Sequence, residues 1–94
     1  MVMSLEVHDH RQLSRYEARV GSDLAGFAAY ELSEGLITFT HTQVEDAYEG
    51  QGIGSALAHF ALDDARARQL AVQPLCPFIK GWIDRHHDYA DLVV

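Results

Sequence analysis

Alternation of apolar and charged residues marks the first half of the chain as a sheet. Across residues 15–20, the apolar Tyr16, Ala18 and Val20 alternate with three charged residues, the pattern of a strand with one buried face. The same criterion predicts strands over residues 4–8, 27–32 and 36–44, with turns at 21–23 and 33–35. Gly35 stands where the second turn is expected to need a positive φ.

The second half changes to the 3.6-residue period of helices that pack on a sheet. Apolar residues stand at positions 53, 56, 57, 60, 61 and 65. A buried strand is predicted over 71–75, followed by a short helix that begins at Pro77. A helix that links strands 36–44 and 71–75 makes those two strands parallel. We therefore predict an α+β fold: a mixed, mostly antiparallel sheet with one parallel strand–helix–strand unit and a short terminal helix.

A glycine-dense turn, Glu-Gly-Gln-Gly-Ile-Gly-Ser-Ala over residues 49–56, separates strand 36–44 from the long helix. Gly50, Gly52 and Gly54 permit backbone angles that a Cβ forbids, so several amide groups can point into one concavity. The helix N-terminus behind them adds unpaired N–H donors and a partial positive charge. The turn is therefore predicted to bind a pyrophosphate group.

Two familiar phosphate-binding motifs do not fit this turn. A Walker loop requires Gly-Lys-Ser/Thr, and the sequence has no lysine between Arg19 and Arg66. The dinucleotide pattern Gly-x-Gly-x-x-Gly fails because Ser55 or Leu57 stands at the third glycine. A nucleoside triphosphatase and a dinucleotide-binding domain are both excluded.

Gly52-Ile53-Gly54, with the flanking Gly50-Gln51, is similar to the pattern Gln/Arg-x-x-Gly-x-Gly/Ala, and the turn resembles the acyl-coenzyme A pyrophosphate loop of the GCN5-related N-acetyltransferases. The resemblance extends from His41-Thr42-Gln43-Val44 through residues 57–62 and 74–78 to Arg85-His86. With Cys76-Pro77-Phe78, the chain is similar to the small, single-domain branch of that superfamily. The resemblance implies one minimal acetyltransferase domain over residues 1–94.

The resemblance also implies where acetyl-coenzyme A binds. The two parallel strands are expected to splay apart, so that the pantetheine arm lies in the wedge and pairs with the backbone near Gln43 and Val44. The pyrophosphate is expected on the glycine turn. The residues assigned to it are Gly50, Gln51, Gly52, Ile53, Gly54 and Ser55.

His41 and Cys76 are the candidate catalytic residues. An amine must lose a proton before it attacks a thioester, and the imidazole of His41 exchanges protons near neutral pH. Its strand neighbours Ile37 and Phe39 are apolar, which predicts a partly buried position facing the wedge. Cys76 stands before a helix, where the dipole favours a thiolate that can accept the acetyl group. Direct transfer with His41 as base, a relay through Cys76 and an inert, buried role for either residue all remain open.

Two positions depart from the family pattern. Glu49 stands where Gln or Arg is usual, and a carboxylate repels a pyrophosphate. Trp82 stands where many larger members have a tyrosine that protonates the leaving thiolate, and indole cannot supply that proton. Tyr89 is the alternative proton donor in this part of the chain.

The composition of the chain limits the kinds of binding partner that can be expected. The formal charge is −7 and only seven residues are Lys or Arg, which excludes nucleic acid as a partner and favours an amine acceptor. No apolar run approaches about 18 residues, so no membrane span is predicted. One cysteine and the absence of a signal pattern indicate a cytoplasmic protein.

The remaining histidines predict no metal site. His8-Asp9-His10 and His86-His87 carry ligand-capable side chains, yet no third and fourth ligand follow at a recognisable spacing. The resulting prediction is an acetyl-coenzyme A-dependent N-acetyltransferase with an amine acceptor. The alternatives are a coenzyme A binding module without efficient transfer and a dimerising structural domain with an empty loop; a homodimer stays open in each case.

Overall fold

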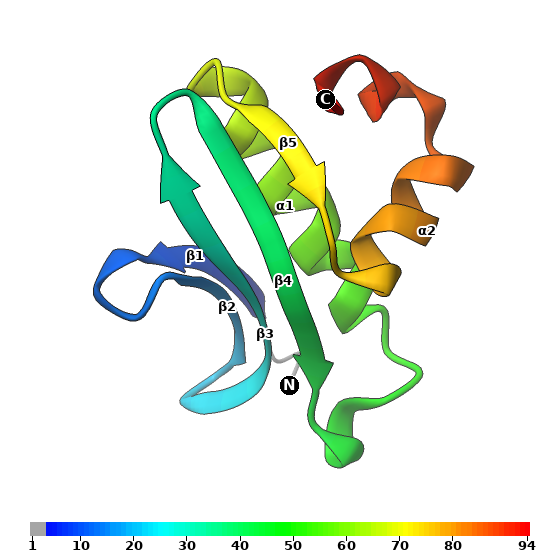
Figure 1. The fold of residues 1–94 in the computed structure, drawn as a ribbon. Helices are drawn as coiled ribbons and strands as arrows, with labels where there is room; N and C mark the ends of the chain where they lie inside the picture. The colour runs from blue at the N-terminus through cyan, green and yellow to red at the C-terminus, as the bar shows by residue number, and fades with distance from the viewer. Residues whose placement is uncertain (1–3) are drawn as a thin grey trace.

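Five strands in sequential order build the sheet of the computed structural model, which describes residues 4–94 (Figure 1). The strands are β1 (Leu5–His10), β2 (Arg15–Val20), β3 (Asp23–Ser33), β4 (Leu36–Val44) and β5 (Ala71–Pro74). The helices are α1 (Ile53–Ala67) and α2 (Pro77–Arg85), with 3₁₀ turns η1 (Arg11–Leu13), η2 (Asp46–Tyr48) and η3 (His87–Leu92). Strands β1 to β4 pair antiparallel, whereas β4 and β5 pair parallel. The predicted fold class is confirmed.

The boundaries of three strands differ from the prediction. The strand predicted over 27–32 begins at Asp23, so the preceding turn is shorter than expected. The edge strand continues to His10 instead of ending at residue 8. Strand β5 ends at Pro74, whose missing N–H cannot extend the ladder. The hairpin glycine Gly35 has a φ of +72°, as predicted.

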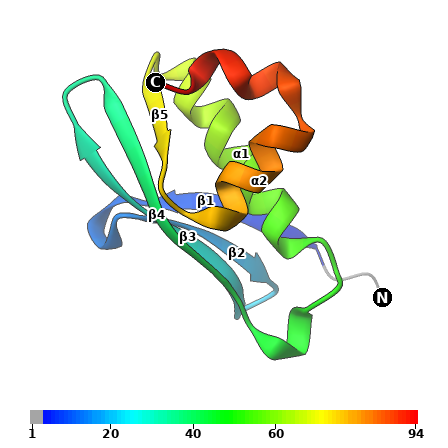
Figure 2. The ribbon, with the colours of Figure 1, turned by 45° about the vertical axis from the view of Figure 1, so that its right-hand side comes forward.

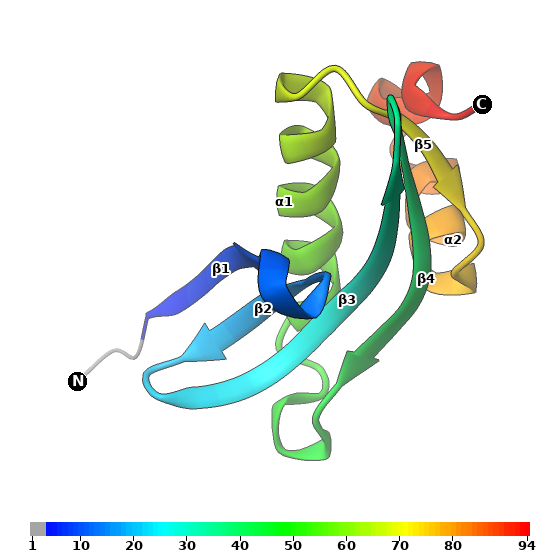
Figure 3. The ribbon, with the colours of Figure 1, turned by 60° about the vertical axis from the view of Figure 1, so that its left-hand side comes forward.

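One face of the sheet is covered by α1, which contacts all five strands (Figures 2 and 3). The core is made by apolar side chains from both layers, including Ile37, Phe39, Leu57 and Leu62, all with no exposed surface. Burial of such side chains supplies most of the folding free energy. The Tyr16 hydroxyl donates a hydrogen bond to Asp64 on α1 at 2.7 Å, which fixes this strand face against the helix.

The opposite face of the sheet carries polar side chains, and one of them is buried. Alternation predicts Glu17 on a solvent-facing row, yet only 1% of its surface is exposed. The guanidinium of Arg15 lies 2.7 Å from one carboxylate oxygen and that of Arg19 lies 3.2 Å from the other. Glu17 therefore lies on the predicted face of the sheet. The expectation that it would be exposed was wrong, because long side chains from adjacent positions cover its carboxylate.

Strands β4 and β5 separate part-way along their length, as Figure 1 shows. Pairing covers only residues 36–39 and 71–74. The Cys76 amide donates to the Phe39 carbonyl at 2.9 Å, after which α2 begins. A register shift between Ala29 and Tyr30 leaves an extra residue in β4 at Thr40, and such a bulge bends a strand. The predicted splayed strands are therefore present in the fold.

Candidate active site

A cavity of about 380 Å³ opens at the end of β4. It lies between the carboxyl end of β4, the glycine turn, the first turn of α1 and the start of α2. Its lining residues are Val44, Tyr48, Glu49, Gly50, Gly52, Ile53, Gly54, Ser55 and Phe78. Six of the eight predicted cofactor-binding residues line this cavity; Gln43 and Gln51 do not.

The three glycines of the turn serve two different purposes. Gly50 and Gly52 have φ values of +78° and +79°, a left-handed region that residues with a Cβ avoid. A Cβ added to either would meet no atom within 4 Å, so these two are needed for conformation. A Cβ on Gly54 would lie 2.7 Å from the Phe78 ring. Gly54 is therefore needed for the close approach of α1 and α2, a packing role the sequence did not reveal.

The first turn of α1 presents free amide groups toward the cavity. The first hydrogen bond of the helix runs from the Ala56 amide to the Gly52 carbonyl at 3.0 Å. Within residues 4–94 no side chain caps the helix, since its N-cap residue is Gly52. The N–H groups of Ile53, Gly54 and Ser55 are the unpaired donors of a helix N-terminus. They and the helix dipole make the turn suitable for an anion.

The alternation of β4 decides which backbone groups face the wedge. The Glu45 amide donates to the Ala25 carbonyl in β3 at 2.8 Å. Residues two apart in a strand point their peptide groups the same way, so the backbone of Gln43, opposite Phe27, also faces β3. The Thr42 and Val44 peptide groups then face the side from which β5 has diverged. The backbone of Gln43, predicted to pair with pantetheine, therefore faces β3, whereas the backbone groups of Thr42 and Val44 face the wedge.

Cys76 lies at the base of the wedge. Only 2% of its surface is exposed, and its thiol donates a hydrogen bond to the Thr42 hydroxyl at 3.3 Å. It is the N-cap residue of α2, next to Pro77. The structure thus brings Cys76 to the strand that carries the predicted pantetheine contact, and it adds Thr42, which sequence reasoning missed.

His41 lies on the face opposite the one predicted. The bulge at Thr40 inverts the alternation, so His41 no longer shares a face with Ile37 and Phe39. Its side chain is exposed and its ring stands edge-on to Phe27, with centroids 6.0 Å apart. His41 therefore lies on the open face of the sheet, along the part of β4 that has no β5 partner.

Trp82 in α2 and Tyr89 in η3 both make contacts away from the cavity. Trp82 is buried and stacks on His86, with ring centroids 3.8 Å apart. The Tyr89 hydroxyl donates to Asp63 on α1 at 2.5 Å. Burial and this hydrogen bond raise the pKa of Tyr89 to about 12. Tyr89 is thus engaged in tying η3 to α1.

Comparison with known proteins identifies the family of this chain. A family model described as GCN5-related N-acetyl-transferase matches residues 15–92. The chain belongs to this family. No match was found among curated proteins.

Two solved structures share the fold. The solution structure of a GCN5-like protein from Staphylococcus aureus superposes with a TM-score of 0.71 at 22% identity, covering 98% of this chain and 88% of the other. The crystal structure of Ard1 from Thermoplasma volcanium gives a TM-score of 0.57 at 22% identity, covering 65% of this chain and 43% of the other. At such identities the similarity concerns the fold. The family match confirms the predicted class, an acetyltransferase, and no helix within residues 4–94 is long and apolar enough to span a membrane.

Proposed function

We propose that the protein is an acetyl-coenzyme A-dependent N-acetyltransferase that acts on a primary amine, such as a small amine, a polyamine or a protein amino group. The observation that carries this proposal is the cavity at the splayed end of β4, with the free amides of α1 on one side. The residues present fit the co-substrate, because Gly50 and Gly52 leave open space where side chains would project.

The pyrophosphate would be held by the amides of residues 53–55, with Gly50 and Gly52 shaping the turn. The side chain of Gln51 contributes to the turn, where its Nε2 lies 3.5 Å from the Ala47 carbonyl. The Thr42 and Val44 peptide groups would pair with pantetheine in the manner of an added strand. Acetyl-coenzyme A supplies the acetyl thioester on which the amine acts.

In the proposed direct transfer, His41 takes a proton from the incoming ammonium group. The neutral amine attacks the thioester carbonyl and the carbon–sulfur bond breaks. The coenzyme A thiolate leaves with the proton that the attacking nitrogen releases. The position of His41 supports this role in one respect, because an exposed imidazole on the open face is accessible to an amine that approaches from that side. Coenzyme A and the amine would then approach β4 from opposite faces.

A relay through Cys76 is the second mechanism. The Cys76 sulfur would take the acetyl group as the carbon–sulfur bond to coenzyme A breaks, and the thiol proton would pass to the departing coenzyme A thiolate. The amine would then attack the acetyl-Cys76 thioester, and the Cys76 thiolate would leave with the proton that the amine nitrogen releases. Burial of Cys76 and its bond to Thr42 keep it close to the wedge. The exposed His41 lies on the other face of β4, so the two residues are proposed as alternatives and not as a nucleophile–base pair.

Calorimetry and an acceptor screen test the proposal. We expect acetyl-coenzyme A to bind the full chain, and expect one member of a mixture of amines, polyamines and basic peptides to gain the mass of an acetyl group. Binding without transfer to any amine would favour the coenzyme A binding module. No binding at millimolar acetyl-coenzyme A would overturn both functions.

Two variants separate the mechanisms. For direct transfer, His41→Ala should lower kcat by about 10²-fold, whereas Cys76→Ala should retain turnover. The matched control is His59→Ala, which removes another exposed histidine, one that pairs with Asp63 on α1. Unchanged turnover in His41→Ala, together with loss in Cys76→Ala, would replace the first mechanism by the relay.

A further inference from the structure

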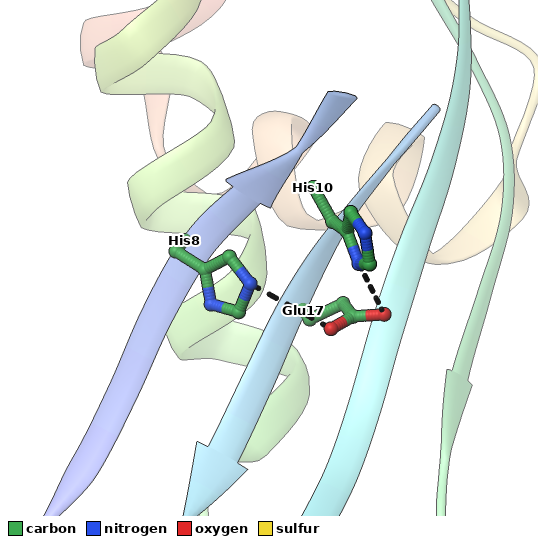
Figure 4. Close-up of side chains that lie close together, drawn as sticks. All are labelled: His8, His10 and Glu17. Carbon is green, nitrogen blue, oxygen red and sulfur yellow. Dashed lines mark ion pairs between the residues drawn. The ribbon is translucent and has the colours of Figure 1, made fainter. Parts of the chain in front are cut away.

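A cluster of three side chains that can ligate a metal lies away from the candidate active site. His8 and His10 of β1 and Glu17 of β2 direct their polar atoms toward one another (Figure 4). One nitrogen from each histidine and a Glu17 oxygen all lie within 4.8 Å of each other. The spacing of these residues in the sequence does not reveal the cluster, because Glu17 comes from the neighbouring strand.

Strand geometry explains how the cluster forms. His8 and His10 are two residues apart and therefore share one face of β1. The register of the sheet places His8 directly opposite Glu17 and makes His10 its diagonal neighbour. The cluster thus lies on the open face of the sheet and joins its edge strand to the next strand.

The distances suit one small cation. His8 Nε2 lies 3.6 Å from Glu17 Oε1, and His10 Nδ1 lies 3.2 Å from Glu17 Oε2. Two ligands of a tetrahedral zinc ion are separated by about 3.3 Å, given bond lengths of about 2.0–2.1 Å. His10 Nδ1 is also the one buried side-chain nitrogen or oxygen among the described residues that has no hydrogen-bond partner. When Nδ1 carries no proton, it and the Glu17 oxygen are two electron-pair donors at a separation that one bridging cation fills.

We propose that His8, His10 and Glu17 bind a divalent transition-metal ion of the zinc type, which clamps β1 to β2. Two imidazoles with one carboxylate favour zinc, copper, nickel or cobalt over magnesium and calcium, which prefer oxygen ligands alone. The guanidinium groups of Arg15 and Arg19 lie beside the Glu17 carboxylate, and positive charges at this distance favour its ionised form, the form that ligates a metal.

The two arginines weaken the site without closing it. A carboxylate has about four lone-pair positions, and Arg15 and Arg19 each approach a different oxygen of Glu17. Their positive charges oppose a second cation nearby. This competition gives the proposal a distinctive consequence: removing the charge of Arg19 should tighten metal binding, which metal bound elsewhere on the surface would not show.

The clamp would act on a strand outside the family match, which begins at Arg15. Strand β1 lies at the edge of the sheet and pairs with β2 alone among the described strands. A metal that binds the folded state alone stabilises it by mass action. Metal binding should therefore protect the β1 amides from hydrogen exchange.

The test is a Zn²⁺ titration of the full chain, without a histidine tag, by calorimetry, with Co²⁺ absorption as a second probe. We expect one ion per chain and a rise in the thermal midpoint. His8→Ala and His10→Ala should each weaken binding at least tenfold, and Arg19→Gln should tighten it about three- to tenfold. Hydrogen exchange should locate the protection in residues 5–10.

The controls are His59→Ala and the double variant His86→Ala/His87→Ala, which remove histidines elsewhere and should leave the affinity unchanged. Circular dichroism of each variant establishes that it is folded. Absence of Zn²⁺ binding at millimolar metal would overturn the proposal. Affinity that survives in the folded His8→Ala/His10→Ala variant would overturn it as well, as would an Arg19→Gln variant that binds Zn²⁺ no more tightly than the parent.

Discussion

The two faces of the sheet hold their polar groups in different ways. On the helix side, the candidate active site offers main-chain amides at the start of α1, shaped by positive-φ glycines. On the open side, the buried polar group is a side chain, Glu17, surrounded by two arginines and two histidines. One arrangement is built from backbone and the other from side chains.

This difference determines what each face can tolerate. Backbone donors survive any side-chain change that preserves the local φ and the packing, so the first site depends on Gly50, Gly52 and Gly54. A buried carboxylate depends on each of its partners, because a charge left unpaired costs more than a paired one contributes. We therefore expect the helix side to be sensitive to added volume and the open side to be sensitive to charge.

The largest expected effect is on the helix side. Gly54→Val places a Cβ 2.7 Å from the Phe78 ring, and overpacking should lower the free energy of unfolding by about 2–3 kcal/mol. Urea denaturation measures this. Gly81→Ala, at a helical position where the Cβ meets only the Arg85 guanidinium at 3.6 Å, is the control and should gain up to about 1 kcal/mol. If Gly54→Val/Phe78→Ala recovers no stability, the clash with Phe78 is not the cause.

The next effect concerns charge on the open face. Glu17→Gln should lower the free energy of unfolding by about 1–2 kcal/mol near neutral pH, because hydrogen bonds to charged partners are lost. The folded pKa of about 2 lies below the ordinary 4.5, so the unfolded state takes up the proton first as the pH falls. The contribution of Glu17 is complete above about pH 4.5 and is lost toward about pH 2.

Urea denaturation of the parent protein and of Glu17→Gln between about pH 7 and pH 3 measures how the difference in their free energies of unfolding depends on pH. The parent and Glu17→Gln should converge as the pH falls. A gap that stays constant through the acid range would show that packing, and not the ionised carboxylate, accounts for the effect of the substitution.

The smallest expected effect is that of the Glu49 charge on ligand binding at the glycine turn. Glu49 lines the cavity, and its carboxylate repels a bound pyrophosphate. Glu49→Gln should raise the affinity for acetyl-coenzyme A about two- to fivefold, the scale of one charge near a helix N-terminus. Asp46→Asn changes a nearby carboxylate that is absent from the cavity lining and should shift the affinity less. Equal gains from both variants would indicate a general field effect.

Local pattern predicted much of the fold. The strands containing residues 15–20 and 36–44 and the parallel crossover were expected from alternation and from helical period, because these patterns report which side of an element is buried. The glycine turn was readable for a similar reason: a positive φ and an open approach require glycine, whatever lies elsewhere in the chain.

Positions that depend on strand register escaped prediction. One extra residue at Thr40 moved His41 to the other face of β4 and turned the Gln43 backbone toward β3. A single-residue slip has this effect because the side-chain period in a strand is two, and nothing in the local sequence marks the bulge. The contact of Thr42 with Cys76 was missed for the same reason. The burial of Glu17 was missed because the long side chains of Arg15 and Arg19 cover its carboxylate.

The sequence by itself determined the order of the elements, the family and the position of the glycine turn, since each depends on residues close together in the chain. The tertiary structure alone decided which side chains meet across strands: Thr42 with Cys76, and Glu17 with His8 and His10. Such meetings depend on register, twist and bulges, which arise from the packing of the whole sheet against α1. A backbone site can therefore be read from its glycines, whereas a side-chain site appears only once the strands are aligned.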